Sequence, residues 1–234
     1  MNNIEKKVLP SNGLIEGIPR EVEIRGMKGR EISTLFSSLT DAAIDNIIKS
    51  VTTPSLDPDE LCDEDKLYIL HQTRVLTFGN EVEQTLRCPA CGMIQDHVFN
   101  YEDFDFTLLE EEKLKEEFTL SDGETVIKRR IVTQDIIKEL ARYKEKFKLP
   151  DSYAFILLQA ARIGKVDGKK KSTSELIEFL NDMQGKDLIK LAKFLDFNFG
   201  LNTNFKIKCT KCQFNFEGGI GINADLFREP DISI

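Results

Sequence analysis

The apolar pattern of the first eighty residues predicts one strand and three helices. Val22 and Ile24 alternate with charged neighbours after a turn at residues 10–13, which is typical of a half-exposed strand. Apolar residues then recur every three or four positions, which indicates two amphipathic helices divided near Thr40 and Asp41. A third helix is expected over residues 64–79, with Gly79 as a left-handed C-terminal cap. The apolar positions of the first two helices are Ile32, Leu35, Phe36, Leu39, Ala43, Ile44, Ile47 and Ile48.

Helical periodicity also dominates the segment between residues 133 and 199. One helix is expected over residues 133–147 and ended by Pro150, and a second over residues 151–164 is apolar nearly all round, as a buried helix would be. Ser172 and Glu175 have the spacing of a capping box before a third helix, and residues 185–197 add a fourth. By contrast, residues 52–65 contain two prolines and several acidic residues, which predicts a loop.

Two Cys-x-x-Cys pairs stand far apart in this pattern, each flanked by residues with strand character. Cys88 and Cys91 form the first pair and Cys209 and Cys212 the second. Two residues between thiolates let a tight turn direct both sulfurs at one tetrahedral ion. A long segment can join two such hairpins, because the entropy of loop closure grows only logarithmically with length. We therefore predict a single structural zinc ion, with these four cysteines as its ligands.

This pattern predicts an α+β fold built on a split zinc ribbon. Residues 1–132 and 200–234 would form the ribbon-containing domain, and residues 133–199 an inserted helical subdomain. The zinc ion would clamp the two hairpins and so hold the insertion in a fixed orientation. The second knuckle has Gln213 where a glycine is common, which makes it the weaker half of the site.

Other interpretations of the cysteines fit the sequence less well. A thioredoxin-like redox pair should open a helix, whereas Gly92 and an extended segment follow Cys91. Unligated cysteines are the other alternative. His97 could replace one cysteine ligand, but it falls in a predicted strand and is better explained as an ordinary surface histidine. His71 is expected to be structural, and Cys62 to be a free thiol.

The net charge and the lack of long apolar runs limit which partners and which cellular compartment are expected. Forty acidic and 32 basic residues give a formal charge of −8, which repels a polyphosphate backbone and makes nucleic acid a poor default partner. Residues near the N-terminus lack the apolar core of a signal peptide, and no uncharged apolar run approaches the roughly 18 residues of a membrane span. We expect a cytosol-like compartment, where reduced thiols favour metal ligation over disulfides.

Catalytic motifs are absent from the sequence. Residues 164–172 fail as a phosphate loop, because Gly164 and Gly168 are too close together and Lys169 is not followed by Ser or Thr. Lys169 to Lys171 are better explained as a solvated loop. No Ser-His-Asp set, nucleophile elbow or dinucleotide fingerprint is present. We expect a non-enzyme without a small-molecule substrate.

Several stretches, taken in order, resemble the T4-like bacteriophage baseplate hub assembly proteins. The turn at residues 9–13 corresponds to the Leu-Pro-Ser-x-Gly turn that opens the family's domain, and the helix with Arg74, Phe78 and Gly79 leads into the first knuckle. The second knuckle precedes a Phe-Arg-Pro-like end at residues 227–230, which Glu229 interrupts. The resemblance touches both ends and the middle of the chain.

The resemblance implies a phage protein that is made in the cytoplasm of the infected bacterium and helps the central hub of a contractile-tail baseplate to assemble. It would act as a chaperone or initiator, or stay in the virion baseplate as a minor component, and its partners would be hub or tail proteins. The insertion and residues 100–106 are candidate partner surfaces, although Tyr101, Phe104 and Phe106 are favoured to pack inward as strand residues. The rival functions are a zinc-ribbon module for nucleic acid or transcription and a redox protein that uses both cysteine pairs.

Overall fold

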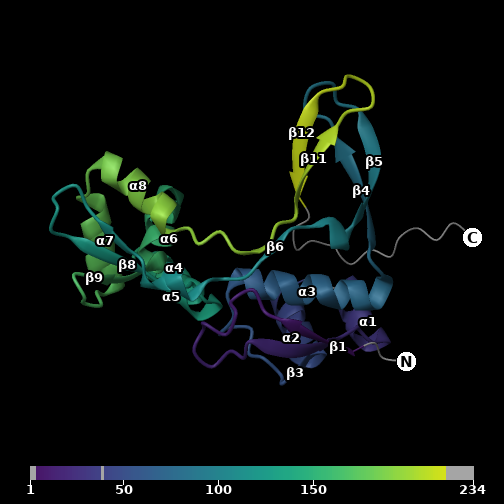
Figure 1. Ribbon diagram of the computed structural model, residues 1–234, viewed down its shortest axis with the longest axis horizontal. Coiled ribbons are helices and arrows are strands. Elements are labelled where there is room, and N and C mark those ends of the chain that lie inside the picture. The colour runs from purple at the N-terminus through teal and green to yellow at the C-terminus, as the bar shows by residue number, and fades with distance from the viewer. Residues whose placement is uncertain (1–3, 38–39, 220–234) are drawn as a thin grey trace, which may run out of the picture.

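The computed structural model describes residues 4–37 and 40–219, and Figure 1 shows three parts arranged around one long helix, α3. Its helices are α1 (Gly29–Ser37), α2 (Asp41–Val51), α3 (Asp63–Phe78), α4 (Glu111–Lys115), α5 (Gln134–Lys146), α6 (Ala154–Arg162), α7 (Thr173–Asn181) and α8 (Gly185–Leu195), with short 3-10 turns η1 (Tyr101–Asp103) and η2 (Asp151–Tyr153). Its strands are β1 (Ile4–Val8), β2 (Glu21–Arg25), β3 (Thr52–Thr53), β4 (Glu81–Arg87), β5 (Ile94–Asn100), β6 (Phe106–Thr107), β7 (Glu117–Thr119), β8 (Val126–Arg129), β9 (Ile163–Val166), β10 (Gly200–Leu201), β11 (Asn204–Lys208) and β12 (Asn215–Gly219). The predicted α+β class is confirmed.

The N-terminal part packs α1, α2 and α3 against a small antiparallel sheet with the strand order β1-β2-β3. Val22 and Ile24 are the buried face of β2, as their alternation predicted. The division between α1 and α2 also falls where it was expected, because the Thr40 hydroxyl caps α2 by accepting from the Ala43 N–H. Leu39 lies outside the described residues. Gly79 ends α3 with a positive φ of 90°, but its ψ of 178° is not left-handed helical.

A second hydrophobic core lies in the part drawn at the left of Figure 1. Helices α5 to α8 supply most of it, and Ser172 with Glu175 forms the predicted capping box at the start of α7. This part also contains a three-stranded sheet with the order β7-β8-β9, which the sequence did not predict. Phe118 and Ile127 belong to this core although they precede residue 133. We propose that the inserted unit begins before that residue.

The helix predicted over residues 151–164 is shorter than expected. Residues 163–166 instead form β9, which pairs with β8, and the helix α6 stops at Arg162. Burial all round is also wrong for this helix, because 48% of Phe155 and 38% of Leu158 are exposed. The preceding helix, α5, already ends at Lys146, and Pro150 comes just before η2.

The inserted unit meets the N-terminal part through backbone contacts. The chain leaves along β6 and returns along β10, and these two short strands pair with each other. At the start of α5, the Gln134 N–H donates to Leu61 O at 2.9 Å and the Asp135 N–H donates to Asp59 O at 2.8 Å. These carbonyls satisfy N–H groups that a helix leaves unbonded in its first turn. The orientation of the insertion is therefore set here, away from the cysteines.

Two antiparallel hairpins, β4–β5 and β11–β12, form a ribbon that projects from α3 (Figure 1). They are separate two-stranded sheets that pack through side chains, with the rings of Phe99 and Phe205 stacked at 3.9 Å between centroids. At the base of the ribbon, Tyr101 is buried in the N-terminal core and Phe104 packs against it. Phe106 is 39% exposed but stacks on Tyr68, with centroids 4.8 Å apart.

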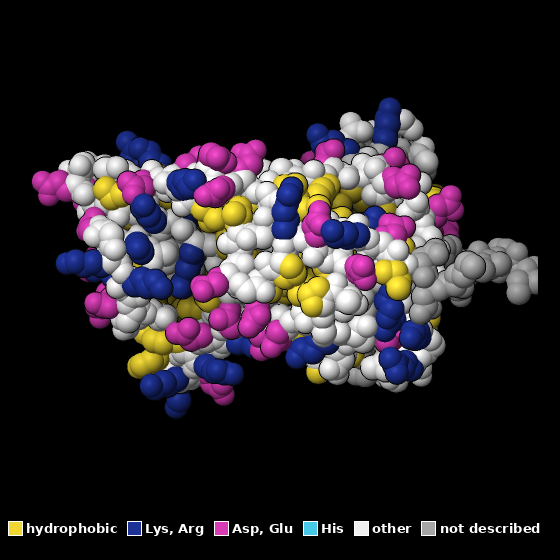
Figure 2. All heavy atoms as spheres, turned by 60° about the horizontal axis from the view of Figure 1, so that its bottom comes forward, with side chains coloured by type: hydrophobic (Ala, Val, Ile, Leu, Met, Phe, Trp, Pro, Cys, Tyr) yellow, Lys and Arg dark blue, Asp and Glu magenta, His cyan; other side chains and the backbone are white. Residues whose placement is uncertain are grey.

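The candidate partner surface at residues 100–106 is therefore mostly occupied by packing within the chain. Tyr101 and Phe104 do face inward, but Tyr101 does so from the 3-10 turn η1 and not from a strand. On the face shown in Figure 2, acidic and basic side chains are intermixed and hydrophobic side chains form small separate groups. Among the described residues, no helix is long and apolar enough to cross a membrane.

Candidate metal centre

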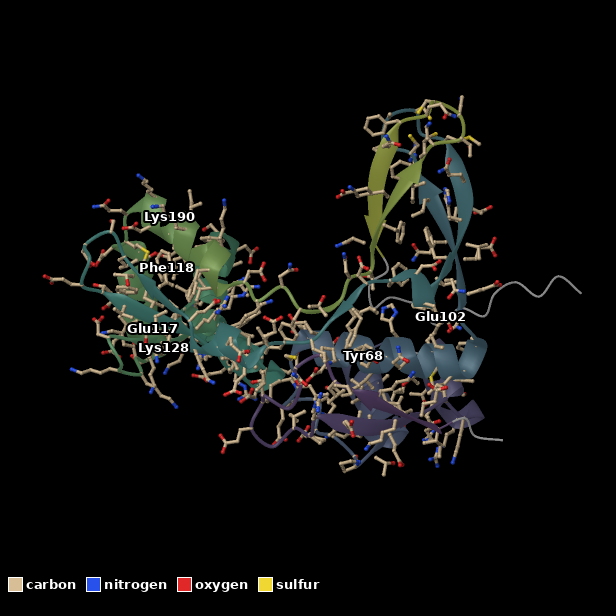
Figure 3. The ribbon with its side chains drawn as sticks, viewed as in Figure 1. Tyr68, Glu102, Glu117, Phe118, Lys128 and Lys190 are labelled. Atoms are coloured by element: carbon tan, nitrogen blue, oxygen red, sulfur yellow. The ribbon has the colours of Figure 1, made fainter. Side chains whose placement is uncertain are left out.

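The ribbon brings the four predicted cysteines together at its tip. Figure 3 shows sulfur atoms gathered at the end of the ribbon that is farthest from α3. Cys88 Sγ lies 3.7 Å from Cys212 Sγ, and Cys91 Sγ lies 3.7 Å from Cys209 Sγ. All four sulfur atoms lie within 4.8 Å of one another. Each close contact joins one hairpin to the other, so the cluster spans both halves of the ribbon.

The spacing of the sulfur atoms fits a tetrahedral ion. A metal–sulfur bond of about 2.3 Å places the corners of a regular tetrahedron about 3.8 Å apart. The two cross-hairpin contacts of 3.7 Å match that edge. In the described part of the chain, no other group of three or more His, Cys, Asp or Glu side chains has comparable geometry. The four cysteines could therefore hold a metal ion.

The two knuckles have the same backbone structure. In the first, the Cys88 N–H donates to Met93 O at 2.8 Å and the Gly92 N–H donates to Cys88 O at 2.9 Å. Gly92 has a φ of +70°, a conformation that suits glycine. Gln213 occupies the matching position of the second knuckle with a φ of +62°. The matching bonds run from Cys209 N to Phe214 O and from Gln213 N to Cys209 O, both 2.9 Å.

Gln213→Gly should stabilise the ribbon by about 0.5–1 kcal/mol, because glycine adopts this backbone conformation without steric cost. Gly92→Ala should destabilise it by a similar amount through φ alone, since an added Cβ would have only ordinary contact with Arg87, 3.6 Å away. Thermal unfolding of both variants checks the pair. A lower melting temperature for Gln213→Gly would show that the side-chain bond from Gln213 Nε2 to Thr210 O outweighs the backbone strain.

Neighbouring groups shift the pKa values of Cys209 and Cys212 in opposite directions. Backbone N–H groups, first that of Cys212, lower the pKa of Cys209 to about 6. A backbone N–H also favours the thiolate of Cys212, but burial and the three nearby sulfurs outweigh it and raise its pKa to about 12. One negative charge therefore forms readily in the cluster. Further thiolates need a cation, because like charges this close repel one another.

Gln95 joins the first hairpin to the second knuckle, and the sequence analysis missed it. Its Oε1 accepts hydrogen bonds from the Thr210 N–H at 3.0 Å and the Thr210 hydroxyl at 3.2 Å. Its amide nitrogen lies 2.6 Å from His97 Nε2. Thr210 lies 115 residues further along the chain, so the sequence carries no local signal for this bond.

The remaining cysteine and the two histidines lie outside the sulfur cluster. His97 contacts Gln95 and stacks on Phe99. His71 is fully buried in α3, and burial, aided by the nearby Arg74 charge, lowers its pKa to about 3. Cys62 is buried immediately before α3, where burial raises the pKa of its thiol. His71 and Cys62 are both fully buried, away from the four sulfur atoms, and Cys62 is a free thiol as expected.

The motif residues of the N-terminal part lie at the base of the ribbon and beside α3. The Ser11 N–H, in the opening turn, donates to Asp65 Oδ1 at 2.8 Å. Arg74 is fully buried, donates to the Gly79 carbonyl and lies over the ring of Tyr101 at 5.2 Å. These contacts fix α3 to its neighbours. Residues 227–230 lie outside the described part of the chain.

Of three comparisons with known proteins, one gives a match, and that match covers the motifs of the N-terminal part. Searches of curated proteins and of solved structures give no match. The family model described as T4 bacteriophage base plate protein matches residues 1–227, which include both knuckles, the N-terminal turn and the inserted unit. The chain belongs to the T4 bacteriophage base plate protein family.

Proposed function

We propose that this chain is a non-enzymatic assembly protein for the hub of a phage baseplate, and that a structural Zn²⁺ clamps its ribbon. The observation that carries the assembly role is the family match over residues 1–227. The protein would act in the host cytoplasm while the tail is built, as a chaperone, an initiator or a minor hub component. Its partners would be hub or tail proteins, with no small-molecule substrate.

Zinc is the ion that best suits the donor set. The proposed ligands are Cys88, Cys91, Cys209 and Cys212, and soft thiolates in tetrahedral array favour zinc or iron–sulfur chemistry. Four thiolates would close the coordination shell, whereas a catalytic zinc keeps one position for water. The proposed role of the ion is therefore structural.

The ribbon needs such a clamp for a physical reason. Its two hairpins form separate two-stranded sheets, and an isolated hairpin is at best marginally stable in water. Phe99 stacking on Phe205 joins the hairpins below the tip, and the Gln95–Thr210 bonds join the first hairpin to the second knuckle. The sulfur cluster is the further connection at the tip, and zinc bonds there would convert two weak hairpins into one rigid unit.

The buried ionisable side chains support a non-enzymatic role. The pKa of His71 is lowered to about 3, so the ring is neutral and, being fully buried, cannot reach a substrate. His97 is engaged by Gln95 within the ribbon. These are the chain's two histidines, so general acid–base chemistry near neutral pH lacks its usual side chain.

The rival functions have less support. Nucleic-acid binding conflicts with the formal charge of −8 and with the mixed charges on the face in Figure 2. A redox role would treat each Cys-x-x-Cys pair as one disulfide, whereas two sulfur contacts of 3.7 Å run between the pairs and draw all four cysteines into one cluster.

Deleting the gene from the phage should abolish complete baseplates, because an assembly factor is needed before the hub can nucleate the rest. Lysates of infected cells, separated by sedimentation and counted by electron microscopy, would show free baseplate components, and a plasmid copy should restore complete structures. Normal numbers of baseplates without the protein would overturn the assembly role.

A further inference from the structure

Strand β5 has an open edge on the outside of the ribbon. It pairs with β4 along its whole length, and the β4–β5 sheet has two strands within the described part of the chain. In Figure 1, β5 is the outermost strand on the side of the ribbon away from β12. Within residues 4–37 and 40–219, one edge of β5 therefore has no strand beside it.

The hydrogen-bond pattern shows which backbone groups face that edge. Next to β5, Met93 O accepts from the Cys88 N–H and the Tyr101 N–H donates to Asn80 O. Hydrogen-bonded and non-hydrogen-bonded pairs alternate along an antiparallel ladder. The odd-numbered residues of β5 therefore bond to β4, and the even-numbered ones direct their N–H and C=O groups outward. Among the described residues, Ile94, Asp96 and Val98 make no backbone bond to another segment.

Two of the three side chains at these positions are exposed and apolar, and Asp96 is the one charge among them. Ile94 is 61% exposed and Val98 is 65% exposed, and both lie on the outer face of the strand with Asp96 between them. Natural sheet edges are usually blunted by proline, lysine or other charged residues. The other ribbon strands follow this rule better, since their outer positions include Glu81, Glu83, Arg87, Lys206, Lys208 and Glu217.

A second copy of the chain fits this edge poorly. In the antiparallel register that pairs Ile94 with Val98, the two copies of Asp96 would lie directly opposite each other. Like charges in that arrangement destabilise a sheet. In the same ladder Glu83 lies beside Val98 and Arg87 beside Ile94, so these two flanking charges offset each other and Asp96 is the charge that decides. The edge therefore suits a strand that carries a basic residue opposite Asp96.

We propose that β5 binds an extended segment of a partner protein as an added strand, with apolar side chains opposite Ile94 and Val98 and a lysine or arginine opposite Asp96. Backbone hydrogen bonds would supply affinity, and the alternating side chains would supply selectivity. That the partner is a baseplate protein rests on the proposed function. The presence of the edge does not rest on the proposed function, because it follows from the hydrogen-bond pattern between β4 and β5.

The test uses the metal-loaded protein and a synthetic seven-residue probe, Thr-Val-Thr-Lys-Thr-Val-Thr, with Glu in place of Lys as the matched control. Hydrogen exchange is followed by NMR at each amide of β5. The Lys probe should slow exchange at Ile94, Asp96 and Val98 by about tenfold or more, and the Glu probe should have little effect. Gln95 and His97, which face β4, should be protected throughout.

Two variants test the geometry. Asp96→Pro removes one outward N–H and none of the backbone bonds to β4, although it loses the bond that the Thr85 hydroxyl donates to Asp96 Oδ1 at 2.7 Å. It should therefore fold but lose the probe's effect. Asp96→Ala keeps the N–H and should respond equally to both probes. Should Asp96→Pro unfold, Val98→Lys serves instead, because a lysine on the edge should block strand addition.

Three results would overturn the proposal. If neither probe slows exchange at Ile94, Asp96 and Val98 while Gln95 and His97 stay protected, the added strand is refuted but the zinc clamp is not. Edge protection that needs no probe and grows with protein concentration would make a second copy the occupant. Loss of protection at Gln95 and His97 in the metal-loaded protein would refute both the edge and the zinc clamp.

Discussion

Cys209→Ser should abolish the proposed metal binding and unfold the ribbon while the N-terminal core stays folded. Cys209 is fully buried, and its Sγ lies 3.7 Å from Cys91 Sγ on the other hairpin. We expect a loss of at least about 3 kcal/mol, a fraction of the roughly 10–16 kcal/mol of apparent binding energy of structural zinc in zinc-finger peptides. Calorimetry gives the stability, and NMR shows which part of the chain unfolds.

The matched control for Cys209→Ser is Cys62→Ala, which removes the buried thiol outside the cluster. Its metal content should be unchanged, and any loss of stability should come from the small cavity that it leaves in the N-terminal core. Retention of both metal and ribbon structure in Cys209→Ser would contradict the clamp.

Gly218→Ala should loosen the ribbon without touching the cysteines. A Cβ at this position would lie 2.5 Å from Cε2 of Phe205, whose ring stacks on Phe99 between the two hairpins. Displacing a packed ring typically costs about 1–3 kcal/mol. Thermal unfolding should show the loss, and Phe205→Leu in the same chain should recover part of it by making room.

Gly185→Ala is the control for Gly218→Ala, because a Cβ there meets no atom within 4 Å and the residue begins α8. Alanine should be neutral or slightly stabilising at that helical position. Equal stabilities of Gly218→Ala and the unmodified protein would mean that the Phe99–Phe205 stack does not hold the hairpins together.

The knuckles were predictable because their information is local. Two residues between cysteines and a glycine after the second one describe a single turn, and Gly92 has the expected positive φ. The capping box of Ser172 and Glu175 is local in the same sense. The order of the N-terminal turn, the α3 motif, the two knuckles and the C-terminal end also identified the family, which the match over residues 1–227 confirms.

The parts that sequence reasoning missed depend on contacts between remote segments. Strand β8 has four residues, too few for a clear alternation, and residues 163–166 become β9 because they pair with it. The apolar residues Ile163 and Val166 are three positions apart, a spacing that fits a helix equally well. Gln95 has no sequence signal for its bond to Thr210, since its partner lies on the other hairpin.

The orientation of the inserted unit was assigned to the wrong contacts. Zinc was expected to hold the insertion in place, but the carbonyls of Asp59 and Leu61 cap α5, and β6 pairs with β10. The proposed metal would therefore stiffen the ribbon, and with it the open edge of β5, independently of the insertion.

Metal analysis of the purified protein, with thiol titration before and after a chelator, tests the zinc clamp most directly. We predict about one zinc per chain, with four cysteines becoming reactive on its removal and Cys62 remaining protected by burial. Iron in place of zinc would change the ion but keep the clamp. Protein without metal, in which both cysteine pairs oxidise reversibly, would contradict it.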